Sequence, residues 1–454
     1  MKQAREVTFN IKKIGLAWYR LSPLKRWSAI AFVIGLLLYV PAFLRTPSAI
    51  ADDSTTGSTA TRAGRLLVFD DVWQTIAQRY YDPAIRGINW EAQRTEFRPL
   101  AAEANSISEF YAILRRMLAR LGDAHTRVFS PEEKFDWWNP RFLSIGISVR
   151  EIEGVPVVVR VDKRSAPERA GVRAGDVIES IDGQPALVLI QQRLLQQPDA
   201  SLHASMRSRA FASVLEGSPG RPVTVRWEGR DGTERKGQFE RYWQQRELGL
   251  RMRRVKGKYA VIEIDAFTKT IAFEFSRLLQ DKLSDAHGIV LDLRGNGGGD
   301  TEAMADVASA FLGEQVPLGQ FTDRTGLIVK IVTHSRSLLT PIKWRRNPLP
   351  LVILTSERTS SASEIFVAAM RVAGRATVIG TETCGCVLAI RSRHPLPDGG
   401  VLDVSELDFR TPDGNRLEGQ PIRSDRLVVL ERSDLYKGRD PGLEAGLAYL
   451  SRTK

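Results

Sequence analysis

A glycine-rich segment that could hold an anion lies in the second half of the chain, where residues 292–300 read DLRGNGGGD. It follows an apolar run and precedes a helical pattern, so its backbone N–H groups would suit an anion or a developing oxyanion near a helix N-terminus. A nucleotide-phosphate loop fits poorly, because no Lys-Ser or Lys-Thr pair follows and the spacing fails the dinucleotide fingerprint. On the residues alone, a plain tight turn remains an alternative.

A second segment, residues 359–365, reads TSSASEI and could supply a nucleophile. Ser361 would open a helix after an apolar strand, and Glu364 three residues later would complete a capping box. A serine in that place also has its hydroxyl near backbone N–H groups, which is what acyl transfer requires. Taken alone, this segment favours the cap over the nucleophile.

The residues around these two segments predict a mixed α/β core over residues 255–435, in which strands alternate with crossover helices. The strands are expected at 259–264, 288–293, 349–354 and 376–379, and the helices at 271–283, 301–312 and 363–372. Upstream, residues 65–130 predict helices with one apolar face each. The second of these helices covers residues 108–121 and is stopped by Gly122.

Residues 143–241 are different, because short β-branched runs alternate there with turn residues. The runs are 145–149, 155–161, 177–181 and 223–227. This segment resembles a PDZ domain, most closely over residues 166–183. The resemblance implies that a glycine-containing loop binds a C-terminal carboxylate through backbone N–H groups, with strand addition beside it. The implied loop residues are Ser144, Ile145, Gly146 and Ile147. A PDZ domain that only packs against its neighbour is the alternative.

The order of a helical segment, a PDZ-like segment, DLRGNGGG and SSASEI resembles the C-terminal processing peptidases, or tail-specific proteases, and their tricorn-core relatives. The likeness covers roughly residues 65–430. It implies that Ser361 is the nucleophile. It also implies that the N–H of Ala362 and the turn around Gly297 and Gly298 hold the oxyanion.

The sequence departs from the usual Ser–Lys pattern of that family at the position of the general base. Cys386 stands where the lysine is expected, and no lysine occurs between Lys343 and Lys437. The tricorn-like branch implies a histidine and a glutamate instead. His125 lies in a matching segment, LGDAHT at 121–126, and Glu418 lies in a partly matching turn at 417–425. Histidine suits the task because its ordinary pKa is near neutrality, and a carboxylate would orient it.

Two alternatives concern this region. His394, which follows the cysteine pair, is the second candidate for the base, and His125 could be a structural histidine that caps the preceding helix. Cys384 and Cys386 are the chain's only cysteines. In an extended strand, residues two apart are separated by close to the upper limit for a disulfide, so two separate apolar fillers are the preferred interpretation. A redox pair remains possible in an oxidising compartment.

The charge of the chain is concentrated at its N-terminus. Of the net +12, residues 1–51 carry +7, from eight basic residues and Glu6, which leaves only +5 for the body. An apolar run at 27–44 follows this basic arm and reaches the minimum length of a membrane-spanning helix. The positive-inside rule puts residues 1–26 in the cytoplasm and the body in the periplasm or another extracytoplasmic space. Cleavage after Ala51, which would release a soluble periplasmic body, is the alternative.

The sequence therefore predicts a multidomain α+β protein. The expected parts are a basic arm (1–26), a transmembrane signal anchor (27–44), a linker (45–64), a helical domain (65–142), a PDZ domain of β-sandwich or barrel-like form (143–241), a protease core of crotonase-like ββα type (242–435) and a tail (436–454).

The predicted function is an exported, membrane-anchored serine endopeptidase that recognises protein C-termini through its PDZ domain. Neither a metal nor a cofactor is implied. The expected partners are proteins or peptides with free C-termini and the membrane, but no nucleic acid, because so little of the charge lies on the body. The sequence does not predict an oligomeric state. A catalytically silent PDZ scaffold of the cell envelope is the alternative.

Overall fold

The computed structural model describes residues 58–453 apart from residues 134–135, 137–138, 196–202, 284, 337–342 and 345. The predicted transmembrane segment at 27–44 lies outside the described residues. None of the helices within the described ranges is long and apolar enough to cross a membrane.

Three helices form the first part of the described chain, as the apolar periodicity predicts. They are α3 (Arg62–Arg79), α4 (Trp90–Ala102) and α5 (Ile107–Ala119), with a 3₁₀ turn at Ile85–Gly87. Each has a polar N-cap: the side chain of Thr61, Asn89 or Ser106 accepts a backbone N–H in the first turn. Their buried faces share a core with a three-stranded sheet. Its strands are β1 (Arg127–Phe129), β18 (Val401–Asp403) and β17 (Arg393–Pro395).

A PDZ-like domain follows, built on a sheet whose strand order is β3-β4-β5-β7-β8. Its elements are β3 (Ile147–Ile152), β4 (Val155–Val161), α6 (Ala166–Arg169), β5 (Val177–Ile181), β6 (Gln184–Pro185), α7 (Ala186–Leu195), α8 (His203–Ala212), β7 (Pro222–Glu228) and β8 (Glu234–Glu240). The chain enters and leaves this domain through one antiparallel pair, β2 (Arg141–Ser144) with β9 (Tyr242–Gln245). Strand β3 lies at the edge of the sheet, beside α8.

The second half of the described chain is organised around a six-stranded sheet of order β10-β11-β12-β15-β16-β20. The strands are β10 (Leu250–Val255), β11 (Tyr259–Ile264), β12 (Gly288–Asp292), β15 (Leu351–Thr355), β16 (Thr377–Gly380) and β20 (Arg426–Leu427). Strand β10 is antiparallel to β11, and the other neighbours are parallel. The crossover helices are α9 (Lys269–Asp281), α10 (Thr301–Leu312) and α11 (Ala362–Val372). The sequence predicts β11 and α10 with these same bounds, and it predicts β12, β15, β16 and the other two helices to within a few residues. It does not predict the two edge strands β10 and β20.

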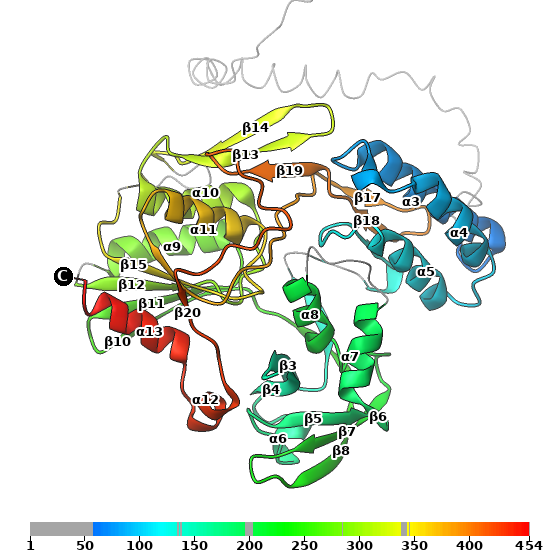
Figure 1. Cartoon of the computed structure of the whole chain (residues 1–454), viewed down its shortest axis with the longest axis horizontal. Coiled ribbons are helices and arrows are strands. Elements are labelled where there is room, and N and C mark those ends of the chain that lie inside the picture. Colours follow the sequence, from blue (N-terminus) through cyan, green and yellow to red (C-terminus); the bar gives the residue numbers. More distant parts are fainter. Residues whose placement is uncertain are drawn as a thin grey trace, which may run out of the picture. The chain divides into compact units, whose positions relative to one another are not determined.

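Alternating strand residues give this sheet two apolar faces. Ile289, Leu291 and Ile353 belong to the core with α9, α10 and α11. Val290 and Val352 belong to the opposite core with α13 (Pro441–Leu450). Figure 1 shows α13 on the other side of the sheet from α9, α10 and α11. Both faces are covered, which explains why these strands read as continuous apolar runs.

The remaining elements lie around the core. A second small sheet has the order β14-β13-β19, formed by β14 (Ile328–Val332), β13 (Pro317–Asp323) and β19 (Leu407–Arg410). The short helix α12 (Arg432–Lys437) precedes α13. Residues 436–454, which the sequence sets apart as a tail, therefore include a helix that packs on the main sheet.

Candidate active site

Ser361 lies in a strained turn between β15 and α11. Its φ and ψ are 57° and −126°, a backbone region that side chains other than glycine rarely adopt. The backbone N–H of Ser361 donates to the carbonyl of Cys386 (2.9 Å) and to Glu364 Oε2 (3.2 Å). A half-buried serine on a tight strand-to-helix turn is the arrangement that presents a nucleophile at the edge of an α/β sheet.

The glycine-rich turn approaches this serine closely. Gly298 has φ +99°, and a Cβ added to it would lie 2.7 Å from the Cβ of Ser361 and 3.0 Å from the N of Ala362. Any side chain at residue 298 would therefore clash with the turn of the nucleophile. The N–H of Gly298 donates to Asn296 Oδ1 at 2.9 Å, so it is already engaged.

Two other N–H groups remain for an oxyanion. Within the described residues, no acceptor pairs with the N–H of Gly297 or of Ala362. Gly297 is exposed, and Ala362 opens α11, whose first N–H groups have no partner inside the helix. The structure thus suits Gly297 and Ala362 as donors, whereas Gly298 provides the close approach between the two turns.

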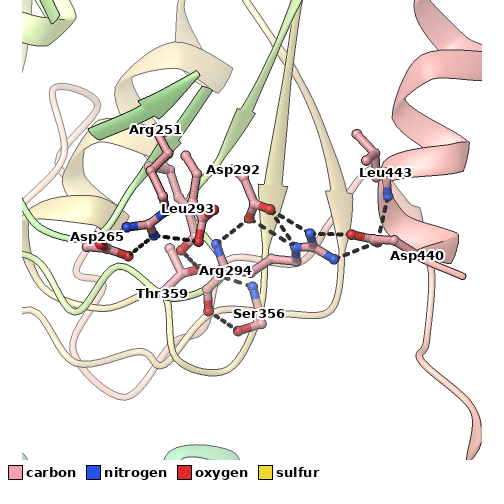
Figure 2. A network of polar contacts seen from close by, with 10 residues as sticks. Arg251, Asp265, Asp292, Leu293, Arg294, Ser356, Thr359, Asp440 and Leu443 are labelled. Carbon is pink, nitrogen blue, oxygen red and sulfur yellow. Dashed lines mark hydrogen bonds and ion pairs between the residues drawn. The ribbon is translucent and has the colours of Figure 1, made fainter. Parts of the chain in front are cut away.

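Hydrogen bonds join the glycine-rich turn to residues 356–361, which are called the serine loop below (Figure 2). Arg294 makes bidentate ion pairs with both Asp292 and Asp440, at 2.5 to 3.2 Å, and these carboxylates raise its pKa despite its burial. The Ser356 hydroxyl donates to the Arg294 carbonyl (2.7 Å), and the Thr359 hydroxyl donates to the Leu293 carbonyl (2.8 Å). Both loops are therefore held in one position relative to each other.

Glu364 has a larger role than the helix cap that the sequence indicates. It is fully buried in α11 and accepts from the Thr383 hydroxyl (2.6 Å), the N–H of Gly385 (2.7 Å) and the N–H of Cys386 (2.8 Å), besides that of Ser361. Burial raises the pKa of Glu364 to about 7, although these hydrogen bonds oppose the shift. The only sequence signal for this role is an acidic residue at a position that faces the core.

Cys384 and Cys386 form a disulfide, with their Cα atoms 5.2 Å apart. The preference for two separate fillers is therefore wrong. An extended strand would separate residues two apart by about 6.6 Å. Here the chain turns at Gly385 instead, where φ is +71°, and this brings the two cysteines closer. The segment 384–388 that begins with this disulfide is called the disulfide turn below.

His125 lies in the loop that follows α5. Asp123 Oδ1 accepts from the N–H groups of His125 (2.9 Å) and Thr126 (2.7 Å), which shapes the loop. The imidazole is buried, and its Nδ1 has no hydrogen-bond partner within the described structure. Burial, and then the positive charges of Arg127 and Arg209, lower the pKa of His125 to about 3. The imidazole is therefore neutral at pH 7, as a general base must be.

Glu418 contacts the other side of the disulfide turn. Its Oε2 accepts from the N–H groups of Val387 (2.8 Å) and Leu388 (3.1 Å), and its Oε1 is buried without a hydrogen-bond partner among the described residues. Burial, and then the negative charge of Asp123, raise the pKa of Glu418 to about 7. The carboxyl group therefore titrates near neutral pH.

The disulfide turn contacts Ser361 and Glu418 of the predicted triad, and it packs against the residue before His125. The carbonyl of Cys386 accepts from the N–H of Ser361, and both cysteines pack against Ala124, which is next to His125. The N–H groups that follow the disulfide donate to Glu418. The hydrogen bonds of the described residues do not join the side chains of Ser361, His125 and Glu418 to one another. The three groups thus surround one turn without forming a hydrogen-bonded chain.

Two further predictions concern residues away from this turn. His394 Nε2 lies 3.1 Å from Glu406 Oε1, in the three-stranded sheet next to the helices, so this second candidate for the base is hydrogen-bonded away from Ser361. In the PDZ-like domain, the N–H of Gly146 donates to Ser144 Oγ at 2.9 Å, and Ser144, Ile145 and Ile147 are buried. A carboxylate bound there would have to displace the Ser144 hydroxyl.

A cavity of about 220 Å³ lies beside the His125 loop. It is lined by the residues around that loop, including Asp123 and Arg127, and by Met206 and Arg209 of α8. The space next to the predicted base is therefore bounded partly by the PDZ-like domain.

Comparison with known proteins assigns the three described parts. The sequence profile of Peptidase family S41 matches residues 258–428, that of the Tricorn protease C1 domain matches 62–119, and that of the PDZ domain matches 157–203. The chain is a serine peptidase, and its core matches Peptidase family S41. The S41 match contains both the glycine-rich turn and Ser361. The expectation of a C-terminal processing peptidase family with a PDZ domain is confirmed.

Curated relatives of this S41 peptidase span most of the chain. It is 26% identical over 452 residues to the carboxyl-terminal-processing protease of Synechocystis sp., covering 94% of each protein. It is 24% identical over 436 residues to carboxyl-terminal-processing peptidase 3, chloroplastic, of Arabidopsis thaliana, covering 88% of this chain and 76% of the relative.

Among solved structures, mature CPAF matches with a TM-score of 0.63 and 13% identity, over 86% of this chain and 96% of that one. The photosystem II D1 C-terminal processing protease matches with a TM-score of 0.50 and 22% identity, over 81% and 93%. At these identities the two structures establish a shared fold.

Proposed function

We propose that this S41 peptidase captures proteins by their C-termini in its PDZ domain and cleaves them through an acyl-enzyme formed on Ser361. The main support is the position of Ser361 in a strained turn, close to the glycine-rich turn and hydrogen-bonded to the disulfide turn. The names of the curated relatives, which describe carboxyl-terminal processing, support the choice of substrate end.

In the proposed mechanism, His125 is the base and Glu418 orients it. The Ser361 hydroxyl attacks the scissile carbonyl while His125 takes its proton, and His125 then protonates the leaving amine. The N–H groups of Gly297 and Ala362 stabilise the oxyanion of each tetrahedral intermediate. Water activated by His125 hydrolyses the acyl-enzyme, which returns the serine to its free form.

Two unpaired buried atoms support this assignment of roles. His125 Nδ1 and Glu418 Oε1 both lack a partner within the described structure, and buried polar atoms are rarely left unpaired. A shift of the His125 loop that brought these atoms together would satisfy both and would fix the histidine tautomer. Substrate binding is the event that we propose to cause this shift.

The test is active-site labelling of the full chain with a fluorophosphonate, together with cleavage of an unfolded reporter protein. Ser361→Ala should abolish labelling and lower the cleavage rate by about 10⁴-fold or more, and His125→Ala should do nearly the same. Ser360→Ala serves as the matched control, because it removes the neighbouring hydroxyl only. Full cleavage by Ser361→Ala would rule out the proposed nucleophile.

A silent PDZ scaffold is the second candidate, because the three catalytic side chains are not hydrogen-bonded to one another within the described structure and the family lysine is replaced by Cys386. This scaffold would bind peptides with free C-termini but would neither be labelled by the fluorophosphonate nor cleave the reporter.

We further propose that residues 27–44 anchor the protein in the inner membrane with residues 58–453 in the periplasm or another extracytoplasmic space. The basic arm before this apolar run is the sequence feature that supports this orientation. The disulfide is consistent with an oxidising compartment. Membrane fractionation measures the anchoring directly.

A further inference from the structure

Arginines of the PDZ domain and of the protease core gather beside the nucleophile. Arg358 lies three residues before Ser361, and Arg150 belongs to the edge strand β3 of the PDZ domain. Arg150 Nη2 pairs with Glu357 Oε1 at 2.7 Å, which links β3 to the serine loop. Arg246, directly after β9, donates to the carbonyl of Gly295 in the glycine-rich turn at 2.9 Å. Arg150, Arg246 and Arg358 are called the arginine cluster below.

The positive charge of this cluster is only partly neutralised. Glu357 is half-buried and already holds Arg150, and the hydroxyls of Ser208 and Thr381 also contact it, each at 3.4 Å. Arg358 is exposed, and no described residue forms a hydrogen bond or an ion pair with its guanidinium.

The cluster lies on the path that a captured peptide would take. A C-terminal carboxylate held at residues 144–147 would lie at the start of β3, so the preceding peptide residues would pair along this edge strand towards Arg150. Arg150 is three residues along from Ile147, about 10 Å in an extended strand. There, the ion pair with Glu357 joins β3 to the segment that carries Arg358 and Ser361.

We propose that the arginine cluster selects substrates that carry acidic side chains between their C-terminus and the bond that is cleaved. Guanidinium groups bind carboxylates through charge-assisted hydrogen bonds, and the exposed Arg358 has free donors for this purpose. The inference rests on the proposed function, because it assumes that the captured peptide reaches Ser361.

The experiment compares two internally quenched peptides with the same C-terminal residues. They differ only in the fourth to sixth residues from the C-terminus, which are Glu in one peptide and Gln in the other. With the full wild-type chain at low salt, kcat/KM should be about tenfold higher for the Glu peptide, and this ratio should shrink as salt screens the charges.

Variants of Arg358 test the origin of the preference. The ratio of the two kcat/KM values should fall to about one in Arg358→Gln, should be largely kept in Arg358→Lys, and should drop below one in Arg358→Glu. Arg277→Gln, which removes an exposed arginine from α9, is the matched control and should keep the wild-type ratio. A wild-type ratio in Arg358→Gln would overturn the inference.

A binding measurement separates this inference from the proposed function. Fluorescence anisotropy with the Ser361→Ala chain gives the dissociation constant of each peptide without any cleavage. If neither peptide is cleaved by the wild type but the Glu peptide still binds several-fold more tightly, the proposed function fails and the charge preference stands. Equal dissociation constants, with cleavage intact, would refute the arginine cluster as a selector.

Discussion

At the scale of single residues, the side chains proposed for catalysis are not hydrogen-bonded to one another within the described structure. His125 Nδ1 and Glu418 Oε1 are buried without partners among the described residues, and each such atom costs about 1–3 kcal/mol. A shift that brought the two atoms together would recover part of this free energy, which favours the shift. The sequence identifies both residues by motif, but it contains no signal that their side chains are apart in the free protein.

The pKa values make a prediction about the pH dependence of cleavage. Burial raises the pKa of Glu418 and of Glu364 to about 7, so both carboxyls lose their charge below that pH. His125 stays neutral far below it, because its pKa is lowered. We therefore expect kcat/KM to rise as the pH increases from 6 to 8, since an ionised Glu418 orients the histidine.

The pH–rate profile should become less steep in Glu418→Gln, because one of the two titrating carboxyls is removed. Glu274→Gln, which changes an exposed acidic residue of α9, is the control. A wild-type profile that stays flat between pH 6 and 8 would contradict this assignment.

The raised pKa of Glu418 also affects the free energy of unfolding. Its stabilising contribution is fully present below the ordinary pKa of 4.5 and is lost as the pH rises through about 7.

At the scale of elements, apolar patterning predicts the strands and helices, and long-range contacts decide the site. Strand β11 and helix α10 follow directly from their apolar runs. The role of Glu364 could not be predicted in the same way, because its partners lie 19 to 22 residues further along the chain. The disulfide was missed because it depends on the backbone of Gly385, which a strand pattern does not reveal.

The disulfide turn is expected to control activity more than stability. It closes a very short loop, so its effect on the unfolded chain is small, but it fixes the carbonyl that binds Ser361. Reduction, or the double change Cys384→Ser and Cys386→Ser, should lower kcat/KM by about 10- to 100-fold, because small displacements of a catalytic group are costly.

The measurement is the cleavage rate before and after treatment with a phosphine reductant, with circular dichroism to verify the fold. The double serine variant should not respond to the reductant, which makes it the control. Unchanged rates after complete reduction would show that the turn keeps its shape without the bond.

At the scale of the whole molecule, the order of the described parts follows from the sequence, but the contacts between them do not. The PDZ domain contacts the protease core through Arg150 and Glu357, and again where the Tyr436 hydroxyl donates to the carbonyl of Gly175. Each of these pairs joins residues more than 200 positions apart. Such contacts depend on the docking of finished domains, which local patterns do not encode.

The N-terminal arm gives a prediction at this same scale. The full chain should stay in the membrane pellet after alkaline carbonate extraction, because residues 27–44 are apolar and the cations before them favour retention on the cytoplasmic side. A chain that starts at Asp52 and is directed to the same compartment is the control and should be soluble. A mature full-length product that begins at Asp52 would instead show cleavage after Ala51.

Helix α13 supports both the main sheet and the glycine-rich turn. Leu443, Leu447 and Leu450 are buried against the main sheet, and Asp440 at the start of the helix is held by Arg294. Unfolding of this helix would uncover one apolar face of the main sheet and would remove one of the two carboxylate partners of Arg294 in the glycine-rich turn. A helix more than 140 residues further along the chain thus helps to hold that turn in place.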